Sequence, residues 1–74
     1  MTPDTYQQKT NEVTLRRQQL DHMRSGAVHL FCAAALANDT GEMDEQRAIV
    51  LSLTEQLLDN EVTTQMLTRQ LLGL

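Results

Sequence analysis

The chain has 74 residues, of which 41% are hydrophobic and 22% charged, and its formal net charge is −4. This length accommodates one small domain, residues 1–74, and no second one. The single cysteine excludes an internal disulfide framework and predicts a reducing, cytoplasmic compartment, and no apolar run reaches the ~20 residues of a membrane-spanning helix.

Few residues in the chain disfavour helix. There are three glycines and one proline, and the rest are mostly helix-forming residues such as Leu, Gln, Ala and Glu. Thr2 before Pro3 is typical of an N-cap followed by a proline in the first turn, and Asp4 suits the positive end of the helix dipole. A first helix is therefore predicted to begin at Pro3.

The first helix contains a row of residues seven apart, which is the spacing of one helical seam. Its members are Tyr6, Val13, Leu20, Ala27 and Ala34. Apolar residues three places after the last three members, Met23, Leu30 and Ala37, are predicted to complete the seam. Lys9 and Arg16 hold the same places in the first two repeats, so the beginning of this helix is expected to be only half buried.

A turn is predicted between residues 38 and 41, where Asn, Asp, Thr and Gly follow one another. Asp39 and Glu42 have the spacing of a capping box, so a second helix should begin at about Gly41. The apolar stripe of that helix is Met43, Val50, Leu53 and Leu57, widened by Ile49 and Leu58.

The sequence Asp59-Asn60-Glu61 interrupts this stripe, and apolar residues resume on a rotated face. The residues that resume it are Val62, Met66, Leu67, Leu71, Leu72 and Leu74. We interpret this segment as a third short helix, with one continuous bent helix as the alternative. The predicted fold is all-α: an antiparallel helical hairpin with a short third C-terminal helix, a small three-helix bundle that oligomerisation could complete.

Antiparallel pairing about a turn centred between residues 39 and 40 sets a register for the hairpin, and opposite charges and matching apolar residues agree with it. The pairs brought together are Arg24 with Glu55, Arg17 with Glu61, Leu30 with Ile49, and Val13 with Met66. Exposed ion pairs contribute only about 0–1 kcal/mol each, so they would select the register more than stabilise the fold.

The segment from Ala27 to Ala37 is apolar around nearly the whole helix, so a two-helix hairpin cannot cover it. The third helix or a second copy of the chain would bury it, or a different protein would dock there. Ala35-Leu36-Ala37 also has the form of a signal-peptidase site, although the polar leader before the apolar region would be unusually long. We expect a protein partner, or the chain itself, to bind through Ala27, Leu30, Phe31, Ala34, Met66, Leu67 and Leu71.

Metal binding and catalysis have little support in the sequence. His22, His29 and Cys32 are the only soft ligands, and the two that lie one turn apart cannot close a tetrahedral zinc site. The acids Glu42, Asp44 and Glu45 belong to the first turn of a helix, where the dipole favours them. No cofactor, metal or enzymatic activity is expected.

Lys9, Arg16, Arg17 and Arg24 could form a basic ridge, but the chain is acidic overall and has two aromatic residues, so direct nucleic-acid binding is not expected. No family motif is recognised. The sequence is interpreted as a non-enzymatic, bacterial-type protein–protein interaction module, an adaptor or co-chaperone. The alternatives are a small acidic inhibitor that mimics nucleic-acid charge, favoured by seven acids in residues 38–74, and a DNA-associated regulator.

Overall fold

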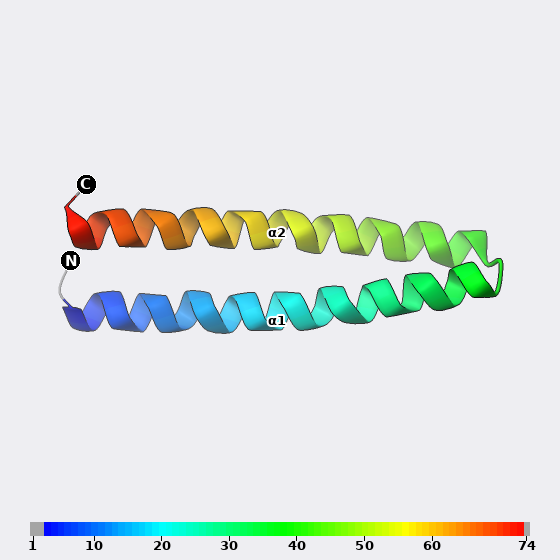
Figure 1. Ribbon diagram of the computed structural model, residues 1–74, viewed down its shortest axis with the longest axis horizontal. Helices are drawn as coiled ribbons and strands as arrows, with labels where there is room; N and C mark the ends of the chain where they lie inside the picture. Colours follow the sequence, from blue (N-terminus) through cyan, green and yellow to red (C-terminus); the bar gives the residue numbers. More distant parts are fainter. Residues whose placement is uncertain (1–2, 74) are drawn as a thin grey trace.

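A computed structural model describes residues 3–73 of the chain, which form two long antiparallel helices (Figure 1). Helix α1 spans Pro3–Leu36 and helix α2 spans Thr40–Leu72. The molecule measures 53 × 18 × 12 Å, so it is a single layer of two helices. The all-α hairpin is confirmed for the described part of the chain. The predicted cap Thr2 and the last leucine, Leu74, lie outside it.

The predicted third helix is wrong, because α2 continues through residues 59–61 without interruption. This segment is polar but contains neither Gly nor Pro, so nothing in its backbone ends a helix. The Asn60 side chain turns toward α1, where its Nδ2 donates to the Val13 carbonyl at 3.1 Å. Asn60 therefore takes a place in the interface between the helices, and the alternative of one continuous helix is the one observed.

The turn reverses the chain within residues 37–39. Asn38 adopts the left-handed conformation, with φ 57°, which Asn tolerates better than other residues with a Cβ atom. Its backbone N–H donates to the Ala35 carbonyl at 3.2 Å, and the N–H of Asp39 donates to the Ala34 carbonyl at 2.9 Å. This pair of bonds is a Schellman motif, which satisfies the last carbonyls of α1 and ends the helix.

Helix α2 begins at Thr40, one residue before the predicted start. Asp39 is its N-cap, and the Asp39 carboxylate accepts a hydrogen bond from the Glu42 backbone N–H at 3.1 Å. Glu42 does not reach back as a full capping box would, because its carboxylate accepts from Gln46 Nε2 at 2.8 Å.

The core is one row of buried residues on each helix, and the members of each row are seven residues apart. The rows are Leu20, Ala27 and Ala34 in α1, and Gln46, Leu53, Asn60 and Leu67 in α2. Tyr6 and Val13 extend the first row as half-buried residues. The predicted seven-residue row is confirmed. The two ribbons approach each other toward the turn, where the row consists of small alanines (Figure 1).

The second half of the predicted seam is wrong. Met23 and Leu30 are about half exposed, and Ala37 is exposed. The half-buried residue beside the row lies four places after a row member rather than three, as Phe31 does after Ala27. An α-helix turns about 100° per residue, so a residue four places later lies nearer the buried row than one three places later. Polar residues such as Arg24 fill some of these positions and conceal the pattern in the sequence.

The register also differs from the prediction. Asn60 contacts the Val13 carbonyl in the place expected for Met66, and an Arg16 guanidinium N–H donates to Gln56 Oε1 at 3.1 Å. The prediction centred the turn between residues 39 and 40, whereas Asn60 beside Val13 corresponds to a centre between residues 36 and 37. When the centre of the turn moves by one residue, the residue opposite any given position on the other helix changes by two.

Of the four predicted pairs, Arg17 and Glu61 do line the same hollow. Leu30 and Ile49 are both exposed and lie outside the core.

Candidate functional site

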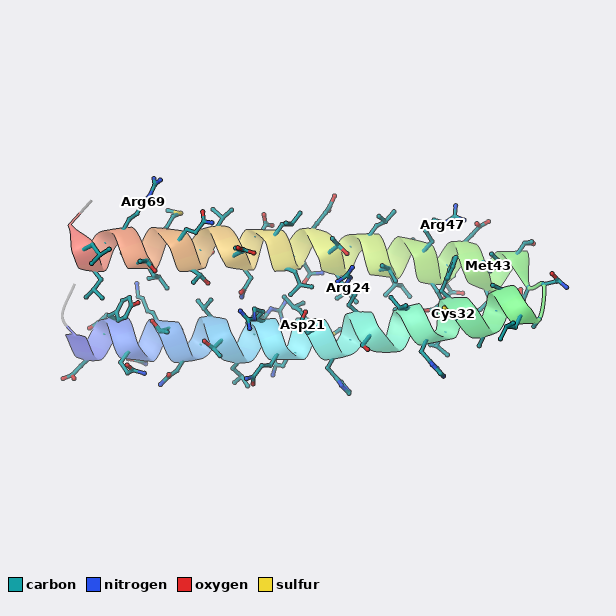
Figure 2. All side chains as sticks on the ribbon, in the orientation of Figure 1. Asp21, Arg24, Cys32, Met43, Arg47 and Arg69 are labelled. Carbon is teal, nitrogen blue, oxygen red and sulfur yellow. The ribbon has the colours of Figure 1, made fainter. Side chains whose placement is uncertain are left out.

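Large apolar side chains remain exposed on both helices, because a single layer of helices gives each one only one neighbour. Figure 2 shows side chains projecting outward along both edges of the hairpin. The exposed ones are Leu15, Met23, Val28, Leu30, Leu36, Ile49, Leu51, Leu58, Val62, Met66, Leu71 and Leu72. Scattered apolar residues are normal on a surface, so the informative feature is where they surround a concave site.

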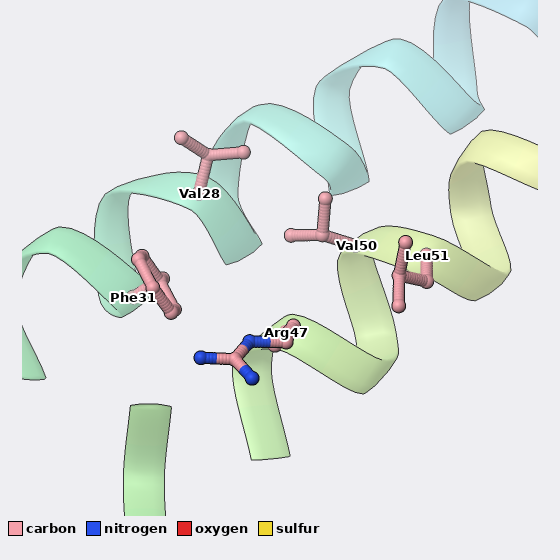
Figure 3. A pocket seen from close by; sticks show the side chains of 5 residues that line it. All are labelled: Val28, Phe31, Arg47, Val50 and Leu51. Atoms are coloured by element: carbon pink, nitrogen blue, oxygen red, sulfur yellow. The ribbon is translucent and has the colours of Figure 1, made fainter. Parts of the chain in front are cut away.

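One such site lies between the helices near the turn, and we name it the turn-proximal groove. It is an open hollow of about 190 Å³. Val28 and Phe31 line it from α1, and Arg47, Val50 and Leu51 line it from α2 (Figure 3). Four of its five lining residues are apolar, and Arg47 supplies the one charge.

The heptad pattern explains why these residues meet. Val28 directly follows the buried Ala27, so it lies on one flank of the buried row and stays 41% exposed. Arg47 directly follows the buried Gln46 and lies on the same flank of α2. The groove therefore lies along one side of the buried rows, where Val28 and Arg47 are on the same flank.

A second hollow lies on the same flank, farther from the turn. Its volume is about 280 Å³, and its lining residues are Arg17, Asp21, Leu57, Asn60, Glu61 and Thr64. Asn60 is nine-tenths buried, and its Oδ1 has no hydrogen-bond partner in the described structure. This hollow contains charges of both signs, unlike the turn-proximal groove.

The predicted partner-binding residues do not form one surface. Ala27, Ala34 and Leu67 are buried between the two helices of the same chain. Phe31 lines the turn-proximal groove. Leu30 lies on the opposite flank of α1, because it is two residues, or about 200°, from Val28. Met66 and Leu71 are exposed near the other end of the hairpin.

Sequence reasoning did not assign Val28, Arg47, Val50 and Leu51 to a site. Val28 lies in the predicted apolar segment and Val50 in the predicted stripe of α2. The missing step was the pairing of the helices, since a hollow between two elements depends on the register. In the observed register, a residue that directly follows a buried one lies on the side of the hairpin where the groove opens, as Val28 and Arg47 do.

The other candidate ligands are dispersed. Cys32 is an exposed free thiol, and in residues 3–73 no three His, Cys, Asp or Glu side chains come together in a way that could hold a metal ion. Arg16 is bound to Gln56, whereas Arg17 lies in the second hollow beside Asp21 and Glu61. The predicted basic ridge is thus divided between two flanks of α1.

Comparison with known proteins identifies no relative of this chain. The chain matches no protein-family model, no curated protein and no solved structure. Neither helix, over the residues described, has the length and apolar character required to cross a membrane. The site is therefore interpreted from its own geometry.

Proposed function

We propose that this protein is a non-enzymatic protein–protein interaction module, of the adaptor or co-chaperone kind, and that the turn-proximal groove is its binding site. The observation that carries the proposal is the apolar lining of an open groove between two helices. An amphipathic helix recognises such a groove by inserting apolar side chains at helical spacing.

The surrounding structure supports this proposal. Phe31 is half buried and lines the groove beside the exposed Val28, so an inserted side chain would meet apolar surface on the α1 side. Burial of apolar surface in such a contact would contribute about 25 cal/mol per Å² before the costs of association are subtracted. Docking of a partner helix in an open groove also requires no enclosed cavity, unlike the binding of a small substrate.

The proposal is tested by affinity capture from the native host, followed by mass spectrometry of what co-purifies. The wild-type chain is compared with Val28→Glu, which places a charge in the groove, and with Leu15→Glu, which makes the same kind of change at an exposed apolar residue outside it. We expect a protein that wild type and Leu15→Glu retain and Val28→Glu loses. Equal recovery with all three baits would contradict the groove as the binding site.

Salt separates this function from charge mimicry. Apolar contacts persist at high ionic strength, whereas long-range attraction between an acidic chain and a basic groove is screened, since the Debye length falls to about 3 Å at 1 M salt. Capture that persists at 1 M salt supports the proposal. Capture abolished by salt and unaffected by Val28→Glu would favour the acidic inhibitor instead.

A further inference from the structure

The chain exposes more surface than its mass requires. Its accessible surface is 5637 Å². A compact monomer of 8.4 kDa is expected to expose about 4,600 Å², so the hairpin exposes about 1,000 Å² more. Each partner in a standard protein–protein interface buries about 800 Å². The surplus is thus of the size that one stable interface would remove.

The surplus arises from the shape. The smallest dimension of the hairpin is 12 Å, the thickness of one layer of helices. Domains generally pack two layers around a core, because a helix has to bury its apolar face against a neighbour. A second layer of two helices on one flank of this hairpin would complete a four-helix bundle.

The hollows and charges distinguish the two flanks. The turn-proximal groove and the second hollow open on one of them, and we name this the groove flank. On the opposite flank the Arg16–Gln56 hydrogen bond bridges the helices. That flank also carries the acids Glu12, Glu45 and Asp59, each directly before a member of a buried row, against the bases Lys9 and Arg16.

The charges of the groove flank are mixed. Arg17 and Arg47 lie there with Asp21 and Glu61. Two copies of a chain with net charge −4 repel each other on average, and this repulsion is weakest on a flank where bases equal acids in number rather than one where acids predominate. The groove flank therefore suits a second copy of the chain better than the opposite flank does.

We propose that a second copy of this chain packs on the groove flank, with both turns at the same end, so that α1 of each copy lies over α2 of the other. This inference rests on the proposed function and names the partner of the same site. The arrangement is two-fold symmetric and brings the two apolar grooves together at the end of the dimer that holds both turns. It places Leu51, which is 60% exposed, at the groove of the opposite copy, and the bases of α1 near Glu61 of the other α2.

The test measures the mass of the purified chain by sedimentation velocity and light scattering between 1 and 200 μM. We expect twice the monomer mass of 8.4 kDa for wild type, and a loss of affinity of at least 100-fold for Val28→Glu, because it buries an unpaired charge. Leu30→Glu is the matched control, since Leu30 is similarly exposed on the opposite flank, and it should remain dimeric. Circular dichroism verifies that both variants stay helical.

A spin label on Cys32, the only cysteine and an exposed one, tests the orientation. Turns at the same end place the two labels well within the 53 Å length of the hairpin, and turns at opposite ends separate them by most of that length. A long distance would overturn the arrangement.

A wild-type monomer at 200 μM, or a dimer that Leu30→Glu dissociates and Val28→Glu does not, would overturn the second copy as the occupant. The proposed function would survive that result if capture from the host still depended on Val28. Both would fail if Val28→Glu altered neither the mass nor the capture.

Discussion

Replacing Asn60 with Leu should stabilise this protein, although it removes a hydrogen bond between the helices. Asn60 is nine-tenths buried, its Nδ2 donates to the Val13 carbonyl, and its Oδ1 has no hydrogen-bond partner within residues 3–73. An unsatisfied buried acceptor costs about 1–3 kcal/mol, whereas a typical hydrogen bond contributes about 1 kcal/mol net. The Val13 carbonyl keeps its ordinary bond within α1. The adjacent hollow of about 280 Å³ has room for the larger Leu side chain.

Burying the Leu side chain adds a further 1.5–3 kcal/mol or so, part of which packing imperfections remove. We expect Asn60→Leu to raise the free energy of unfolding by about 2 kcal/mol, which corresponds to about 8–16 °C in Tm for a chain of this size. Urea and thermal unfolding followed by circular dichroism measure both quantities. The control is Gln65→Leu, an exposed change on the same helix, which should shift stability by less than about 0.5 kcal/mol.

A polar residue in a helical seam specifies register at a cost in stability, so Asn60→Leu should also allow other registers or assemblies. Additional species in sedimentation velocity would report this change. If Asn60→Leu instead lost 1 kcal/mol or more without aggregating, the bond to Val13 would be worth more than the unpaired oxygen costs, and the reasoning would be refuted.

Three other changes test separate parts of the fold by thermal unfolding. Gly26→Ala should gain about 1 kcal/mol, because a Cβ atom there meets nothing within 4 Å and Gly disfavours a helix interior; a loss would mean that Gly26 packs closely against something. Asp39→Ala should lose about 1 kcal/mol with the cap of α2, and Asp39→Asn, which keeps the acceptor, should lose much less. Deleting residues 62–74 removes buried Leu67 and should lower stability by at least 2 kcal/mol and fray the beginning of α1; an unchanged melting temperature would show that this segment serves only a partner.

The local features of the fold could be predicted from sequence because they depend on neighbouring residues. The turn formers and the Asp39–Glu42 spacing located the start of α2 to within one residue. The seven-residue row from Tyr6 to Ala34 identified the face of α1 that α2 covers. Each of these signals lies within a few turns of helix, where propensity and periodicity act directly.

The pairing of the two helices could not be predicted in the same way. A turn centred between residues 39 and 40 placed Val13 opposite Met66, and matching charges agreed with that register, yet exposed ion pairs are too weak to choose between registers. The observed register places Asn60 and Gln46 in the buried row, and a rule that expects apolar residues inside passes over both. Because the groove depends on this register, Val50 and Leu51 could be recognised as lining residues only after the helices were paired.

The hairpin shape also determines where a fusion partner or a surface tether lies relative to the turn-proximal groove. Pro3 and Gly73 lie at the same end of the molecule, and the turn lies at the other (Figure 1). With a long dimension of 53 Å, a fluorescent protein or a surface tether joined to either terminus stands clear of the turn-proximal groove. A donor dye on the first turn of α1 and an acceptor dye on the last turn of α2 would be close together in the closed hairpin and would separate as the helices part. Energy transfer between them therefore reports opening of the hairpin without any label near the groove.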